Sequence, residues 1–226
     1  MHECTKDSLG AMNNFPQIMR ILESEYQRFP IPSVSLIAHE RDPFKVLVGC
    51  LISLRTKDAV TFPAAERLFS LADTPEAMMR LSPTSVEKAI YPASFYRVKA
   101  KRIIEISRIL IEEFGGKVPD EIDELLELPR VGRKTANLTV TLGYGKLGIC
   151  VDSHVHQISN RLGFVNTTSP EKTEFALRKI LPPRYWIKYN DFLVAFGQNV
   201  CVPVSPHCSS CKLSEYCPKI GVGKRR

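Results

Sequence analysis

The sequence lacks any run of about 18 apolar residues, so it predicts no transmembrane helix. Its first residues, MHECTKDSLGAMNN, are polar and lack the apolar core of a secretory signal peptide. Strand signals are scarce, and there is neither a low-complexity linker nor a clear internal repeat. These absences favour a helical, cytoplasmic protein with no membrane partner.

The composition is that of an ordinary globular protein, with 44% hydrophobic and 24% charged residues among 226. That length suits one large domain or two small ones. The formal net charge is +7 and the isoelectric point is about 9.1. A basic balance favours an anionic partner, with nucleic acid first and an anionic membrane surface second. Charge alone does not decide this, because many basic proteins bind no nucleic acid.

Helix signals follow one another along the chain. Three pairs combine a capping side chain with a proline at the first helical position, namely Asp42-Pro43, Thr74-Pro75 and Ser82-Pro83. The segment FKVLVGCLISL after the first pair is apolar all round, which predicts a central buried helix with Cys50 in the core. We therefore expect an all-α fold.

Four of the seven cysteines lie close together near the end of the chain, with the spacing C-x6-C-x2-C-x5-C: Cys201, Cys208, Cys211 and Cys217. In a reducing compartment such a group indicates a metal rather than disulfides. Structural zinc usually shows two CxxC-type pairs, whereas a [4Fe–4S] cluster accepts wider and uneven spacing. The spacing favours iron–sulfur and leaves zinc as the alternative.

The segment LPRVGRKTAN predicts a helix end, a tight turn and a second helix. Amide groups at such a turn can hold a phosphate, and Gly132 allows a nucleic-acid backbone to approach closely. Arg133 and Lys134 add positive charge. An ordinary helix–turn–helix corner with a solvated Arg-Lys pair is the alternative.

Asp152 lies in the segment VDSHV, 18 residues after Lys134, where it begins a predicted helix. An aspartate at this position is usually a structural N-cap. Its significance depends on the other two motifs.

The three motifs in this order, LPxVGRKTAN, VDSHV and the cysteine pattern, resemble those of the endonuclease III family of helix–hairpin–helix DNA glycosylases. The resemblance implies an all-α fold of two helical lobes. One is a six-helix barrel with the helix–hairpin–helix motif, over residues 37–146. The other is an iron–sulfur cluster domain that joins residues 1–36 to 147–226.

The same resemblance implies a base excision repair enzyme, a DNA glycosylase with abasic-site lyase activity. Its partner is double-stranded DNA that contains damaged bases, oxidised pyrimidines above all, and the enzyme is expected to be a monomer. Lys134 matches the family's nucleophile, which forms a Schiff base and permits β-elimination. Partial burial and the nearby helix start are expected to lower its pKa. Asp152 matches the carboxylate, for proton transfer or charge stabilisation. The four cysteines match the ligands of a [4Fe-4S] cluster.

The sequence departs from the family pattern where DNA is contacted. Arg130 replaces the usual Gly of the hairpin, Arg55 replaces a Gln that fills the gap left by the flipped base, and Phe95 replaces a Leu wedge. Phe95 has a second interpretation, as a core residue at a helix start. His154 of VDSHV completes the DNA-contacting set. Residues 202–207 contain no Lys or Arg, which questions a phosphate contact there.

Two other functions remain open at this point. A mismatch glycosylase would remove thymine or uracil opposite guanine, or adenine opposite oxidised guanine. Such relatives often lack the lysine, so Lys134 argues against this alternative, while Arg55 and Arg130 leave it open. A non-catalytic iron–sulfur DNA-binding protein would need neither Lys134 nor Asp152.

Overall fold

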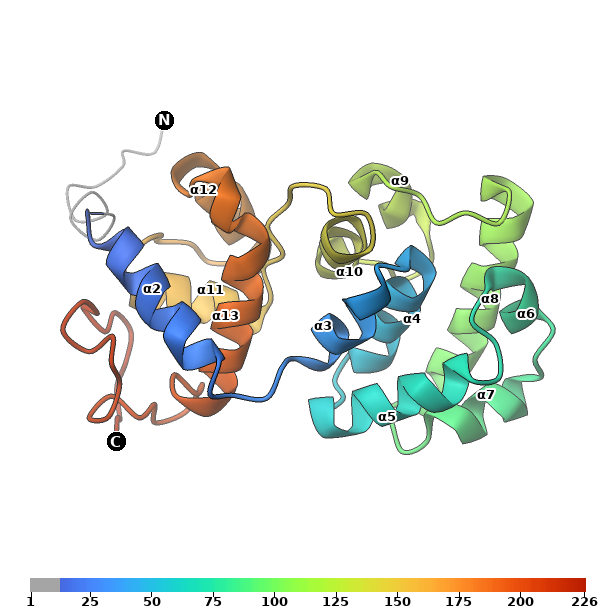
Figure 1. Cartoon of the computed structure of the whole chain (residues 1–226), viewed down its shortest axis with the longest axis horizontal. Helices are drawn as coiled ribbons and strands as arrows, with labels where there is room; N and C mark the ends of the chain where they lie inside the picture. The colour runs from blue at the N-terminus through green and yellow to red at the C-terminus, as the bar shows by residue number, and fades with distance from the viewer. Residues whose placement is uncertain (1–12) are drawn as a thin grey trace. The chain divides into compact units, whose positions relative to one another are not determined.

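The computed structural model describes residues 13–226, and all regular elements in this range are helices (Figure 1). Cys4 and most of the polar start lie outside the described residues. The expectation of an all-α fold is confirmed. None of the helices in the described range is long and apolar enough to cross a membrane.

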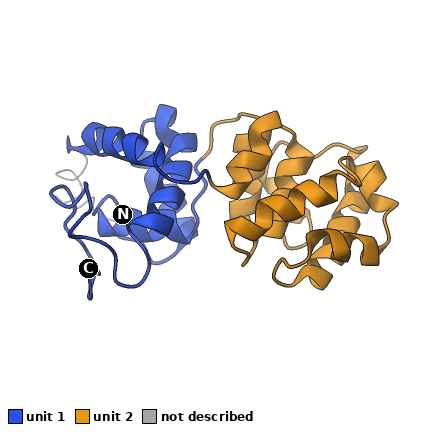
Figure 2. Cartoon of the chain, turned by 60° about the horizontal axis from the view of Figure 1, so that its bottom comes forward, with its two compact units in different colours: residues 1–31, 149–226 blue, residues 32–148 orange. Residues whose placement is uncertain are grey.

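The chain divides into two compact units (Figure 2). Unit 1 comprises residues 1–31 and 149–226, and unit 2 comprises residues 32–148. Each unit has a separate hydrophobic core. The C-terminal half of unit 1 therefore returns to the N-terminal helix and packs on it.

Unit 2 is built around α4 (Pro43–Ser53), which is buried on nearly all sides. The other elements of this unit are α3 (Ser33–Ile37), η1 (Ala38–Glu40), α5 (Asp58–Phe69), α6 (Pro75–Met79), α7 (Pro83–Ile90), α8 (Tyr96–Phe114), α9 (Ile122–Glu127), α10 (Arg133–Leu138) and η2 (Thr139–Gly143). Helices α3, α5, α8 and α10 and the π-helical turn η2 all contact α4. The apolar run of the sequence is thus the axis of a helical barrel, and Cys50 is a core residue as predicted.

The predicted helix starts are confirmed by hydrogen bonds. The Asp42 carboxylate accepts from the amides of Phe44 and Lys45 at 2.8 and 3.0 Å. Thr74 and Ser82 cap α6 and α7 in the same way. Each cap satisfies an amide that the first helical turn leaves without a partner.

Unit 1 contains α2 (Phe15–Tyr26), α11 (Ser153–Arg161), α12 (Pro170–Ile180), η3 (Pro183–Tyr185) and α13 (Trp186–Asn199). Helix α13 packs against α2 and α11. The Phe15 ring contacts the rings of Phe164 and Tyr185 edge to face, which fixes α2 to the C-terminal half of the unit. The cysteine-bearing segment follows α13 as a series of turns.

Candidate functional site

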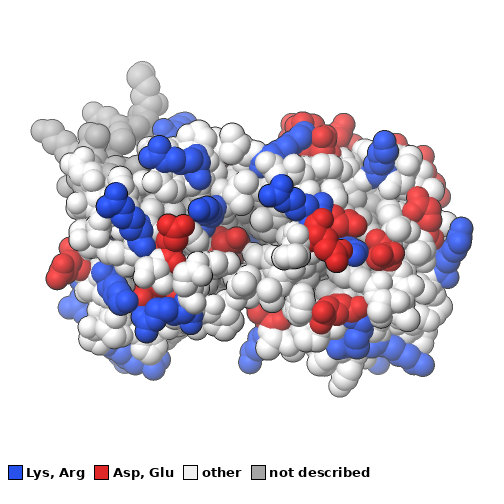
Figure 3. Space-filling view, viewed as in Figure 1, with Lys and Arg blue, Asp and Glu red and all other residues white. Residues whose placement is uncertain are grey.

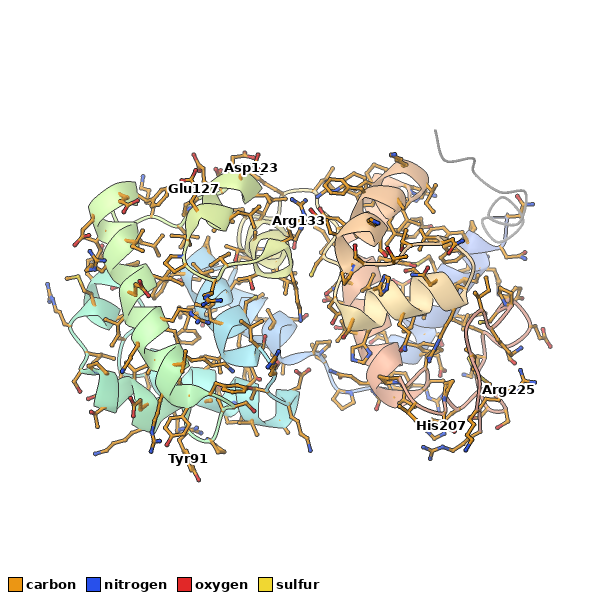
Figure 4. The ribbon with its side chains drawn as sticks, turned by 180° about the vertical axis from the view of Figure 1, so that it is seen from behind. Tyr91, Asp123, Glu127, Arg133, His207 and Arg225 are labelled. Atoms are coloured by element: carbon orange, nitrogen blue, oxygen red, sulfur yellow. The ribbon has the colours of Figure 1, made fainter. Side chains whose placement is uncertain are left out.

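The hairpin between α9 and α10 contains a tight turn at Arg130. Leu128 and Val131 are buried beneath the turn, and the Val131 amide donates to the Leu128 carbonyl. Arg130 between them is exposed and has φ +62°, in the left-handed region that glycine favours. Figure 4 shows Arg133 at the start of α10 and Asp123 and Glu127 on α9. The turn thus places an arginine side chain at its exposed tip, in a conformation that glycine adopts more readily.

Gly132 is the N-cap residue of α10 and has an extended backbone with φ −104°. A Cβ atom placed there would meet nothing within 4 Å. Neither the backbone conformation nor packing against the part of the chain that the structure describes therefore requires glycine here. The open space lies at a helix N-terminus, where amides point outward and favour an anion.

Lys134 lies in the first turn of α10 and is half-buried. Helix α10 packs on α4, and the positive charge of Lys134 acts on the Cys50 thiol of that helix. Burial raises the pKa of Cys50 to about 12, and the Lys134 charge opposes this rise. The nucleophile predicted from the sequence is thus next to the central helix of unit 2.

Arg55 and Phe95 are brought together in unit 2. The guanidinium carbon of Arg55 lies 5.9 Å from the centroid of the Phe95 ring, within the range of a cation–π interaction. Phe95 is 62% exposed, so the interpretation of Phe95 as a core residue is wrong. We call these two residues the wedge.

The wedge and the hairpin tip share unusual backbone geometry. Six non-glycine residues in the range 13–226 have positive φ, and three of them are Arg55, Phe95 and Arg130. A side chain in the left-handed region costs on the order of 1–3 kcal/mol, and such strain gathers at functional sites. Half of this strained set therefore coincides with positions predicted to contact DNA.

In unit 1, Asp152 caps α11 as its position in the sequence predicts. One carboxylate oxygen accepts from the amides of His154 and Val155, each at 2.9 Å. The residue is 9% exposed. These two bonds hold the carboxylate in one orientation.

The His154 ring packs against the backbone of Gly197, where a Cβ atom would stand 2.4 Å from the imidazole Nδ1. This nitrogen is buried and has no hydrogen-bond partner among the described residues. Gly197 is therefore required by the position of the His154 ring. A contact between His154 and DNA stays a prediction.

The four clustered cysteines line one cavity, together with apolar residues such as Ile158, Phe196 and Leu213. Burial raises the pKa of the Cys201, Cys211 and Cys217 thiols, that of Cys211 to about 11. Backbone amides of Leu213 and Lys219 donate toward Cys211 and Cys217 and oppose this rise. No three His, Cys, Asp or Glu side chains in the described range are arranged to hold a single metal ion.

Arg161 is a residue of this site that sequence reasoning missed. It is 6% exposed, and its guanidinium donates to the Cys201 sulfur at 3.2 Å and to the Cys201, Val202 and Pro203 carbonyls at 2.9–3.2 Å. Helical spacing gave the available signal, because Arg161 follows the buried Val155 and Ile158 on one face of α11. It ties the helix that Asp152 begins to the first cysteine.

The positive charge is not gathered into one patch on the face that Figure 3 shows. Lys and Arg side chains are spread over both units there, with Asp and Glu between them (Figure 3). A local group of donors, such as the one at the hairpin, is therefore stronger evidence for an anionic partner than the net charge is.

Comparison with known proteins agrees with the motifs. Residues 48–183 match the HhH-GPD superfamily base excision DNA repair protein family. Endonuclease III of Thermotoga maritima is 47% identical over 178 residues, which cover 79% of this chain and 84% of that protein. Endonuclease III homolog 2, chloroplastic, of Arabidopsis thaliana is 42% identical over 184 residues, which cover 77% of this chain but 48% of that protein.

A solved structure gives the same result for the fold. The structure of a trapped endonuclease III–DNA covalent intermediate is 34% identical and has a TM-score of 0.76, with 90% of this chain and 95% of that chain covered. The chain therefore belongs to the HhH-GPD superfamily of base excision DNA repair proteins, and within it to the endonuclease III family.

Proposed function

We propose that the protein is a DNA glycosylase with abasic-site lyase activity that removes oxidised or damaged pyrimidines from duplex DNA. Family membership supports the repair role. The observation that carries the proposal is the position of Lys134, in the first turn of α10 directly after a hairpin whose Gly132 faces open space. A phosphate held at that helix start would bring a nucleotide sugar toward the lysine.

The reaction begins once the damaged nucleotide has left the base stack. The neutral Lys134 amine attacks C1′, the bond to the base breaks, and the base departs with the electron pair and takes up a proton. Loss of an amine proton and ring opening give a Schiff base. Removal of a C2′ proton then expels the 3′ phosphate, which cuts the strand.

Asp152 supplies a carboxylate whose direction is fixed by its two bonds to α11 amides. In the proposed reaction it accepts or relays a proton, or stabilises positive charge that develops on the sugar. Both roles require a fixed orientation, which the cap provides. The pairing of Asp152 with Lys134 is part of the proposal.

The cavity of Cys201, Cys208, Cys211 and Cys217 fits a [4Fe–4S] cluster. Hydrogen-bond donors reach three of the four sulfurs, from Arg161 and from two backbone amides, and such bonds stabilise thiolate ligands. A zinc ion would need all four sulfurs about 2.3 Å from one point, whereas the wide and uneven spacing C-x6-C-x2-C-x5-C suits the larger cluster. When bound, the cluster would cross-link the turns of residues 201–217 and supply no catalytic step.

A substrate panel tests the proposed function. Duplexes would carry thymine glycol, dihydrouracil, uracil opposite guanine, or an abasic site. The proposal expects release of the two oxidised or reduced pyrimidines, with strand cleavage there and at the abasic site. Removal of uracil opposite guanine without strand cleavage would contradict the proposal and indicate a mismatch glycosylase. Binding of the duplexes without release of any base would contradict it and indicate a non-catalytic DNA-binding protein.

A further inference from the structure

Lys99 is a buried lysine that the proposed chemistry does not use. It lies in the first turn of α8 and is 4% exposed. Its ammonium nitrogen donates to the carbonyl oxygens of Ile52 (2.6 Å) and Leu54 (2.7 Å) and to the hydroxyl of Thr56 (2.8 Å). The three N–H groups of the ammonium thus have three acceptors.

These acceptors belong to the end of α4 and the segment that follows it. Helix α4 ends at Ser53, and the carbonyls of a last helical turn lack partners within their own helix. They also carry the negative end of the helix dipole, which attracts a cation. Burial lowers the pKa of Lys99 to about 8, with a smaller contribution from Arg102 on the same helix. The carbonyls thus compensate a buried positive charge that forms no ion pair with a carboxylate among residues 13–226.

Thr56 extends the connection to a second segment. Its hydroxyl oxygen accepts from the backbone amide of Ser94 at 3.1 Å, besides accepting from Lys99. Ser94 directly precedes Phe95, and Thr56 directly follows Arg55. The bonds through Lys99, Thr56 and Ser94, which we call the Lys99 network, therefore join the two segments that bear the wedge.

The network lies where the backbone needs support. Arg55 has φ +54° and Phe95 has φ +57°, conformations that side chains rarely adopt. Such residues persist only where their surroundings over-determine them. The Lys99 network holds Thr56, next to Arg55, and Ser94, next to Phe95. In addition, the Arg55 guanidinium lies over the Phe95 ring.

We propose that Lys99 is a positioning residue for damage recognition: its ammonium fixes residues 54–56 and 94–95 against each other, so that Arg55 and Phe95 enter the duplex as one preformed wedge. This inference rests on the proposed function, since it assigns the wedge to lesion-bearing duplex DNA. Preformation matters because a group placed 1 Å away from its productive position can lose roughly 100-fold in rate.

Two variants test the network. Lys99→Met removes the ammonium and keeps an unbranched side chain, and Thr56→Val removes the hydroxyl and keeps the shape. Ile106→Ala is the control, because Ile106 is buried on the same helix, about two turns after Lys99, and takes no part in the hydrogen bonds of the Lys99 network. Single-turnover rates would be measured on a duplex with paired dihydrouracil and on a single strand with an abasic site, which offers no duplex to enter.

Lys99→Met should lower the duplex rate roughly 30-fold or more and Thr56→Val about 3- to 10-fold, while single-strand cleavage stays within about 3-fold. Ile106→Ala should change both rates by one common factor. Equal losses on both substrates, or an unchanged duplex rate, would overturn the inference. If Lys99→Met does not fold, the Thr56→Val variant tests the inference in the same way, by comparing its loss of rate on the duplex with its loss on the single strand. A wild-type protein inactive on both substrates would instead refute the proposed function.

Discussion

The guanidinium carbon of Arg55 lies 5.9 Å from the centroid of the Phe95 ring, and both residues hold a left-handed backbone. The pair joins the end of α4 to the start of α8 on the surface of unit 2. A cationic plane beside an exposed aromatic ring is suited to stacking between bases. The two positions predicted to contact DNA are therefore in contact with each other.

Arg55→Ala should weaken processing of a paired lesion about tenfold, because the space left by the flipped base would not be filled. Cleavage of a single-stranded abasic site should change little. Arg55→Gln keeps a polar side chain that can donate hydrogen bonds into this space and should retain most of the duplex activity. Single-turnover rates on both substrates give the result, and a uniform loss would show that Arg55 supports folding instead.

The Arg130→Gly variant should be more stable than the wild type and bind DNA more weakly. Removing a side chain from φ +62° relieves strain and should raise the free energy of unfolding by about 0.5–1 kcal/mol. Loss of the guanidinium should weaken duplex binding and reduce the slope of log affinity against log salt by about 1, if Arg130 neutralises one phosphate. Urea denaturation and binding titrations at several salt concentrations measure both. Unchanged affinity at every salt concentration would exclude the phosphate contact.

Gly132→Ala should leave the free protein intact, because the added Cβ atom meets nothing within 4 Å and the backbone is extended. Duplex affinity should fall roughly tenfold, equivalent to about 1.4 kcal/mol, because the methyl group would occupy the space of an approaching phosphate. Gly223→Ala is the matched control, since its Cβ atom also meets nothing. If both variants bind DNA like the wild type, the open space at Gly132 does not face the partner.

The purified protein should be yellow-brown and contain iron and sulfide. Cys208→Ala should lower the iron content and the soluble yield together, because the cluster cross-links the C-terminal turns. The Arg161→Met variant should also contain less iron, because it lacks the hydrogen-bond donor to the Cys201 sulfur. Cys150→Ala is the control, because this buried thiol lies outside the cluster of four. Elemental analysis that finds one zinc and no iron would contradict the assignment.

Local signals predicted much of the fold. Asp42, Thr74 and Ser82 cap helices as their pairing with proline indicates, because capping involves only the next three residues. Asp152 was identified as a cap in the same way. The partners of Lys99 and Arg161 were not predicted, since the carbonyls that they hold are 40 or more residues away.

Phe95 shows a different limit. A residue at a helix start can face either the core or the solvent, and the sequence left both open. In the structure Phe95 precedes α8 in a left-handed conformation and its side chain is exposed, a backbone geometry that the sequence pattern did not predict. The roles of Lys134 and Asp152 stay predictions, since capping and packing do not reveal a reaction.

Borohydride trapping tests the central claim most directly. The wild-type protein, a lesion-bearing duplex and borohydride should give a covalent protein–DNA adduct, and peptide mapping should place the DNA on Lys134. Lys134→Gln should give no adduct while still binding the duplex, and Asp152→Asn, whose amide can still cap α11, should form it on the order of 10²-fold more slowly. An adduct of equal yield from the Lys134→Gln variant, or one mapped to another residue, would contradict the account.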